Sequence, residues 1–91
     1  MRDELRANKN VLLTEVGDGQ AVLLHLDTKF YYTLNATGVT VWKKLDGASA
    51  TREEIAAELS KQFRVDADVA ARDLEPVLAE MIAEGLVAQS A

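Results

Sequence analysis

The fold is decided by residues 21–35, which read AVLLHLDTKFYYTLN. The runs Ala21 to Leu26 and Lys29 to Leu34 are rich in aliphatic, aromatic and β-branched residues, which is typical of strands. Asp27 and Thr28 stand between them as a short turn. Because such a turn is too short for a parallel crossover, the two runs predict an antiparallel hairpin.

Side chains of the strand Lys29 to Leu34 alternate between its two faces. We expect one face to pack on the core, and this face holds Phe30, Tyr32 and Leu34. The opposite face holds Tyr31 and Thr33. The last strand of the hairpin is therefore expected to be covered on one side only.

A further strand is predicted before this hairpin. Val11 to Val16 is rich in aliphatic and β-branched residues, and Gly17-Asp18-Gly19 follows as a turn signal. The three strands then form an antiparallel meander with two open edges. The unpaired backbone groups of an open edge invite pairing with another chain.

The next segment is predicted to form two helices. Asn35 is a good N-cap for a helix that runs to about Leu45, where Gly47 supplies a left-handed stop. On this helix Val39, Trp42 and Leu45 share one face, with Lys43 and Lys44 turned outward. Thr51 and Glu54 have the spacing of a capping box at the start of a second helix, before Ile55, Leu59 and Phe63.

A third helix is predicted to begin after Asp66 and to end at Gly85. Its apolar positions are Ala70, Leu74, Val77, Leu78, Met81 and Ile82. Pro76 lacks the N–H that would bond to the carbonyl of Arg72, so we expect a kink, or a split near Asp73. Beyond the helix, Leu86 and Val87 are expected to dock the end of the chain on the core.

The order of elements predicts an α+β fold of winged-helix-like type, a three-stranded antiparallel sheet followed by three helices. Ninety-one residues are enough for one domain, which we expect to span residues 1–91. Apolar residues make up 48% of the chain and charged residues 27%, a balance that is typical of globular proteins.

The composition also indicates the cellular compartment. The chain has no cysteine, which is compatible with a reducing compartment. It has no apolar run near the roughly 18 residues that a membrane span needs, and residues 1–10 lack the apolar segment of a signal peptide. We therefore expect a cytoplasmic protein without a membrane partner.

The residues offer little support for catalysis. His25 is the single histidine, and because it alternates with Leu24 and Leu26 we expect it on the solvated face of a strand. One histidine without cysteine makes a zinc site improbable, and no glycine-rich phosphate loop is present. Trp42 is expected in the core rather than as a ligand platform. The expectation is a protein that is not an enzyme and holds no metal or cofactor.

A small α+β domain with three helices could also be a winged-helix regulator that binds DNA. Duplex binding needs lysine and arginine on the element that meets the phosphates. The predicted third helix has one base, Arg72, against the acidic residues Asp68, Asp73, Glu75, Glu80 and Glu84. Its charge and the net charge of −5 argue against a nucleic-acid partner.

Several short motifs occur together in one order along the chain. They are residues 22–27 (VLLHLD), 30–38 (FYYTLNATG), 41–42 (VW), 45–47 (LDG), 71–74 (ARDL) and 84–87 (EGLV). Together, over about residues 10–88, they resemble the PqqD-like proteins. This group includes coenzyme PQQ synthesis protein D and the precursor-peptide recognition domains of ribosomal peptide pathways. Residues 26–29 (LDTK) replace the Pro-Glu pair usual in coenzyme PQQ synthesis protein D, which favours a generic recognition module.

The resemblance implies a non-catalytic peptide chaperone that binds the leader of a precursor peptide. In such proteins the leader adds as a strand at the edge of the third strand and lies against the last helix. Carried onto this sequence, the docking strand comprises Lys29, Phe30, Tyr31, Tyr32, Thr33 and Leu34. The wall on the helix comprises Val69, Arg72, Asp73, Pro76, Val77 and Glu80, of which Arg72 and Asp73 would read charges on the leader.

The implied partners are a precursor peptide and a separate maturation enzyme such as a radical SAM protein, a cyclase or a protease. Two other functions stay open beside this one. The domain could be a structural module that pairs with itself through an edge strand, or a DNA-binding regulator. The sequence leaves the protein as a monomer or a homodimer, and it does not name the peptide, the enzyme or the product.

Overall fold

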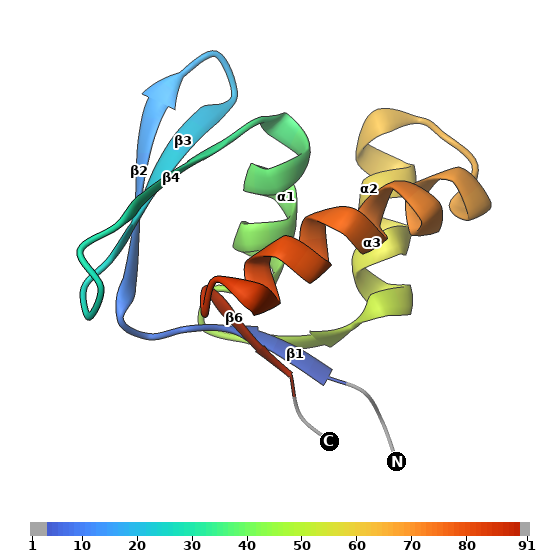
Figure 1. Cartoon of the computed structure of the whole chain (residues 1–91). Coiled ribbons are helices and arrows are strands. Elements are labelled where there is room, and N and C mark those ends of the chain that lie inside the picture. The colour runs from blue at the N-terminus through green and yellow to red at the C-terminus, as the bar shows by residue number, and fades with distance from the viewer. Residues whose placement is uncertain (1–3, 90–91) are drawn as a thin grey trace.

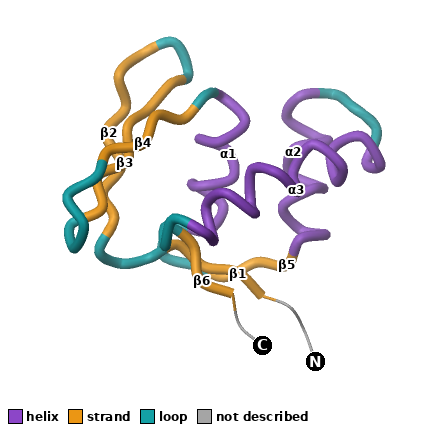
Figure 2. Tube along the Cα trace, in the orientation of Figure 1, coloured by secondary structure: helices purple, strands orange, loops and turns teal. Residues whose placement is uncertain are grey.

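The computed structural model describes residues 4–89, which form two small sheets and three helices (Figures 1 and 2). The α+β class is confirmed, as is the meander followed by three helices. The elements in chain order are β1 (Glu4–Ala7), β2 (Val11–Gly17), β3 (Gln20–His25), β4 (Tyr31–Leu34), α1 (Ala36–Leu45), β5 (Ser49–Thr51), α2 (Arg52–Phe63), α3 (Ala67–Ala83) and β6 (Val87–Gln89).

The predicted meander is the sheet β2-β3-β4, in which both neighbouring pairs are antiparallel. Its tight turn at residues 17–19 uses left-handed backbone at all three positions, which glycine adopts without strain. A register shift between Glu15 and Gly17 bends the end of β2. Since such bulges hinder further pairing, β2 is a poor edge for another strand.

The second sheet was not predicted. Its strand order is β5-β1-β6, with β1 in the centre and antiparallel to both neighbours. Figure 2 shows it running beneath the helices, apart from the meander. Leu86 and Val87 are buried at the start of this last segment, so the expectation that they dock the chain end on the core is confirmed.

The helix signals of the sequence hold at α1 and α2. The Asn35 side chain accepts a hydrogen bond from the N–H of Gly38, and Gly47 has a positive φ just after α1. Thr51 and Glu54 form the predicted capping box. Asp66 occupies the N-cap position of α3, although its side chain makes no capping hydrogen bond.

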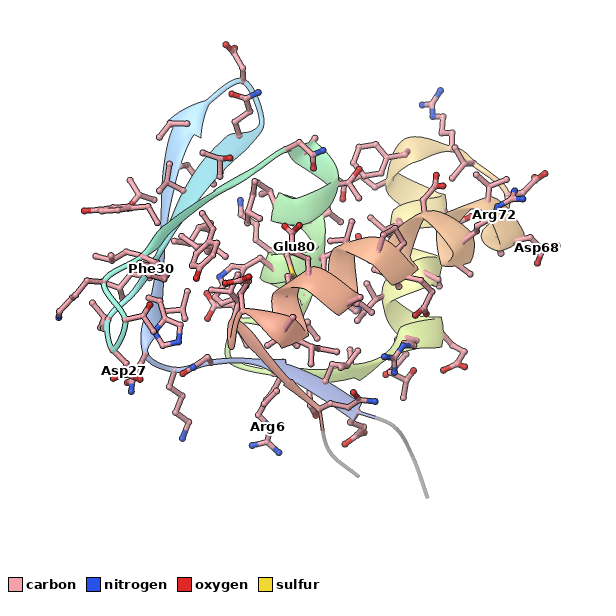
Figure 3. All side chains as sticks on the ribbon, viewed as in Figure 1. Arg6, Asp27, Phe30, Asp68, Arg72 and Glu80 are labelled. Atoms are coloured by element: carbon pink, nitrogen blue, oxygen red, sulfur yellow. The ribbon has the colours of Figure 1, made fainter. Side chains whose placement is uncertain are left out.

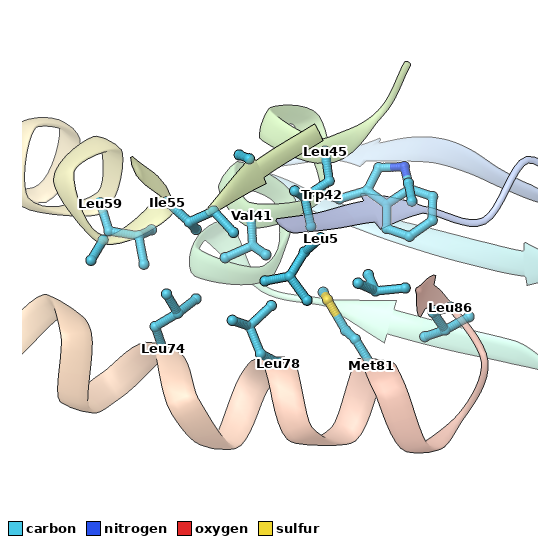
Figure 4. Close-up of a cluster of buried hydrophobic side chains, with 14 of the residues drawn as sticks. Leu5, Val41, Trp42, Leu45, Ile55, Leu59, Leu74, Leu78, Met81 and Leu86 are labelled. Atoms are coloured by element: carbon cyan, nitrogen blue, oxygen red, sulfur yellow. The ribbon is translucent and has the colours of Figure 1, made fainter. Parts of the chain in front are cut away.

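One core joins the two sheets to all three helices. Figure 4 shows its centre, where Leu5 of β1 and Trp42 of α1 lie above the apolar side of α3. Trp42 is 1% exposed, so the prediction that it is a core residue is confirmed. Its indole N–H has no hydrogen-bond partner among the described residues.

Two expectations about buried faces are wrong. His25 is buried, not solvated, because the inward positions of β3 are Ala21, Leu23 and His25. Its Nδ1 accepts a hydrogen bond from the backbone N–H of Asp27 at 3.2 Å, which supports the turn before β4. Phe30 is 61% exposed and does not pack on the core. The cause is Lys29, whose φ of 68° places it in the turn and delays the strand to Tyr31.

Pro76 does not split α3, which is continuous from Ala67 to Ala83. The proline costs the helix one hydrogen bond, because no N–H is available for the carbonyl of Arg72. Pro76 and Arg72 are both exposed, so water can solvate that carbonyl. The packing of Leu74 and Leu78 on the core holds the helix together across this point.

We expect Pro76→Ala to stabilise the free protein by about 1–3 kcal/mol, since alanine restores the missing donor and has a much higher helix propensity. Urea unfolding followed by circular dichroism measures the change. An unchanged or lower midpoint would show that packing of the proline ring contributes more than the missing hydrogen bond costs.

Candidate functional site

The outer edge of β4 is open. Among residues 4–89, β4 pairs only with β3, in the register Ala21 with Leu34 and Leu23 with Tyr32. The N–H of His25 donates to the carbonyl of Phe30 at 3.0 Å, which marks that opposed pair as hydrogen-bonded. Because hydrogen-bonded and non-hydrogen-bonded pairs alternate in antiparallel sheets, the backbone groups of Tyr31 and Thr33 point away from β3.

A groove of about 280 Å³ lies between this strand and α3. It is lined from the strand side by Tyr32, Thr33, Leu34, Asn35 and Gly38, and from the other side by Pro76, Val77, Glu80, Met81 and Leu86. Most of the side chains from the helix side are apolar, and Glu80 is the one charged lining residue among the described residues. A free strand edge beside an apolar groove has the geometry for holding an extended peptide.

Gly38 fixes one end of the strand side. A Cβ at this position would lie 3.0 Å from Cδ2 of Leu34, so any larger residue would require the Leu34 side chain to shift. In the sequence, Asn35 and Gly38 give only the signal of a helix start, which does not mark them as groove residues.

A hydrogen bond crosses from the strand to the end of α3. The hydroxyl of Tyr32 donates to Oε1 of Glu84 at 3.0 Å. Desolvation and then the adjacent Glu84 carboxylate raise the pKa of Tyr32 above its ordinary value of 10.0, so the hydroxyl stays protonated and continues to donate. This contact ties the first half of β4 to the C-terminal end of α3.

Six of the twelve predicted site residues line this groove, namely Tyr32, Thr33, Leu34, Pro76, Val77 and Glu80. The other six do not line it, namely Lys29, Phe30, Tyr31, Val69, Arg72 and Asp73. Figure 3 shows Arg72 near the far end of α3, well away from Phe30 and the meander. Asp73 is exposed and lies one turn before Pro76. The groove therefore uses only the C-terminal half of the helix.

Sequence reasoning missed four lining residues, which are Asn35, Gly38, Met81 and Leu86. Met81 and Leu86 are buried, and the hydrophobic pattern assigned them to the core, where they also belong. A residue at the border of core and groove gives no separate signal in a hydrophobic pattern.

Larger hollows occur elsewhere, but their positions differ from that of this groove. One of about 480 Å³ lies between β1 and the loop after α1, and one of about 450 Å³ lies between the β2–β3 hairpin, α1 and α2. Neither adjoins the outer edge of β4.

No group of three or more His, Asp or Glu residues within residues 4–89 is placed to hold a metal ion. In the same range, no helix has the length and apolar character to cross a membrane.

The family model that describes coenzyme PQQ synthesis protein D (PqqD) matches residues 20–87. The chain belongs to the PqqD family. The match confirms the resemblance seen in the sequence, and it spans β3, β4 and α3, the elements on either side of the groove.

Two solved structures are similar to this PqqD-family chain over nearly its whole length. TbiB1 in complex with the TbiA(beta) leader peptide is 29% identical, with a TM-score of 0.81 over 94% of this chain and 98% of that chain. Lasso peptide synthetase B1 complexed with the leader peptide is 20% identical, with a TM-score of 0.74 over 92% of this chain and 96% of that chain. The second likeness shows the fold alone. No curated protein matches the sequence.

Proposed function

We propose that this PqqD-family chain binds the leader of a ribosomally made precursor peptide and presents it to a separate maturation enzyme. The observation that carries the proposal is the open edge of β4 beside the apolar groove on α3. The chain is 29% identical to TbiB1, which was solved in complex with a leader peptide. That likeness supports the same class of ligand for this chain.

The binding mode follows from the geometry of the edge. The outward N–H and C=O groups of Tyr31 and Thr33 form main-chain hydrogen bonds with a leader that lies beside β4. Alternate side chains of the leader then point toward α3, where Leu34, Val77 and Met81 offer apolar contact. Backbone bonds supply affinity for any extended peptide, and the groove supplies selectivity.

The protein's own part in the reaction is to hold the peptide. The groove provides contact area and backbone hydrogen bonds, and the chemistry belongs to the partner, which we infer to be a radical SAM protein, a cyclase or a protease. Holding the leader at one site raises the effective concentration of the attached core peptide at the enzyme.

Amide hydrogen exchange tests the proposed docking strand. We expect the leader of a precursor encoded beside this chain to slow exchange at Tyr31 and Thr33, because their N–H groups become hydrogen-bonded. The amides of α2 serve as an internal reference and should change little.

Two outcomes would contradict this binding mode. Protection confined to the helices would place the peptide elsewhere. Protection of β4 that rises with protein concentration in the absence of peptide would instead favour self-association through the edge strand.

A further inference from the structure

The C-terminal end of α3 is acidic and lacks a compensating charge. Its last turn has no basic residue, and Glu84 follows directly as the C-cap. The carbonyl end of a helix is already partially negative, so carboxylates there are unfavourable and a cation is favourable. Among the described residues, neither Glu80 nor Glu84 has an ion-pair partner.

This acidic end contacts β4 at Tyr32. The Tyr32 hydroxyl contacts Glu84, so the first half of β4 lies beside the end of α3. Leu34 at the other end of β4 borders the groove together with Gly38, Pro76 and Val77. Within residues 4–89, Glu80 is the one charged residue of the lining, and Glu84 follows it by one turn and lies at the border of the groove, on the Tyr32 hydroxyl. We call the part of the groove beside Tyr32 its acidic half and the part beside Leu34 its apolar half.

A peptide strand added beside β4 would place one of its α3-facing side chains in the apolar half and the next one in the acidic half. Residues directly opposite each other in a sheet point to the same face, and every second residue of a strand shares that face. A peptide residue opposite Leu34 thus faces the apolar half. The residue opposite Tyr32 faces the acidic half, where Glu84 lies beside Tyr32 and Glu80 stands one turn before Glu84 on α3. These two peptide positions are separated by one intervening residue.

We propose that the groove selects leaders in which an aliphatic residue and a lysine or arginine stand two positions apart, both facing α3. The inference rests on the proposed function and names the class of peptide that the site accepts. The aliphatic residue comes first if the leader runs antiparallel to β4, and second if it runs parallel. An acidic residue at the position opposite Tyr32 is repelled by the Glu80 and Glu84 carboxylates and by the carbonyl end of α3, whichever way the leader runs.

A displayed library of random peptides, selected on the immobilised protein, tests this pattern. The peptides considered are those that bind this protein and fail to bind the Thr33→Pro variant, since these use the edge of β4. We expect them to be enriched in an aliphatic residue and a lysine or arginine at this spacing. Enrichment of edge-dependent peptides without a basic residue there overturns the selectivity and leaves the proposed function standing. The absence of any edge-dependent peptide overturns both.

Charge-neutral variants then test which carboxylates cause the preference for a basic peptide residue. Glu80→Gln and Glu84→Gln should each weaken a selected basic peptide about two- to fivefold, the range of a solvent-exposed ion pair. Neither variant should affect the same peptide with its basic residue changed to methionine. Glutamine at position 84 can still accept from Tyr32, so the contact with β4 is retained.

Asp73→Asn is the matched control, because it removes the same charge from the same helix outside the groove. This variant should bind the peptide with unchanged affinity. Added salt should weaken binding only where the protein keeps its carboxylates and the peptide keeps its basic residue. Equal losses from Asp73→Asn and Glu80→Gln would mean that net charge, not the acidic half of the groove, attracts the peptide, and would overturn the proposal.

Discussion

Thr33→Pro is expected to weaken leader binding about 10- to 100-fold while the free protein keeps its fold. The N–H of Thr33 points away from β3, so proline removes a donor to the peptide and no bond within the sheet. The peptide carbonyl opposite would be left without a partner, which costs about 1–3 kcal/mol. The Thr33 side chain is exposed, so core packing is unaffected. Fluorescence anisotropy with labelled leader measures the affinity.

Two variants separate this effect from others. Thr33→Ala removes the side chain and keeps the N–H, so its affinity should stay near that of the unchanged protein. Glu15→Pro places proline on the opposite edge of the meander, on the exposed end of β2. Its affinity should also be retained. If Glu15→Pro abolishes binding and Thr33→Pro does not, the leader docks on β2 and the proposed groove is not the binding site.

Local signals explain why the helices could be predicted. The cap at Asn35 and the capping box of Thr51 and Glu54 are interactions between residues three apart, so the sequence contains all of their information. The meander was predicted for the same reason, since its turns join strands that are neighbours in the chain. The start of β4 was misplaced because the left-handed backbone of Lys29, which is not a glycine, gives no sequence signal.

The groove was harder to predict because it depends on how β4 crosses α3. The stripe that holds Val69, Asp73, Val77 and Glu80 runs along the whole helix, and helical spacing alone treats these positions alike. The contact between Tyr32 and Glu84 and the lining, which begins on α3 at Pro76, show that the groove lies along the C-terminal half of the helix. The resemblance to the family therefore proposed a longer wall than the groove has.

The second sheet escaped prediction because its partners are far apart in the chain. β1 contains the charged residues Glu4 and Arg6 and no β-branched residue, so its local preference for a strand is weak. It forms because β5 and β6 pair with it on both sides. Its single large apolar residue, Leu5, is 0% exposed within the core.

Leu5→Ala is expected to lower the free energy of unfolding by about 2–5 kcal/mol, the usual cost of truncating a fully buried leucine. The loss combines the transfer of the removed atoms with the cavity that remains among residues of α1 and α3 (Figure 4). Small domains are stable by only about 5–15 kcal/mol, so this substitution would remove a large share of the total. Urea or thermal unfolding measures the change.

Arg6→Ala is the control on the same strand, since Arg6 is exposed and occupies the central position of β1. A surface substitution of this kind should change stability by less than about 0.5 kcal/mol. Leu5 does not line the groove, so Leu5→Ala should retain its affinity for the leader wherever the protein remains folded. Equal stability of the two variants would mean that β1 is not integrated into the core. A loss of affinity without a loss of stability would mean that β1 acts on the groove directly, and would require the leader to reach beyond β4 and α3.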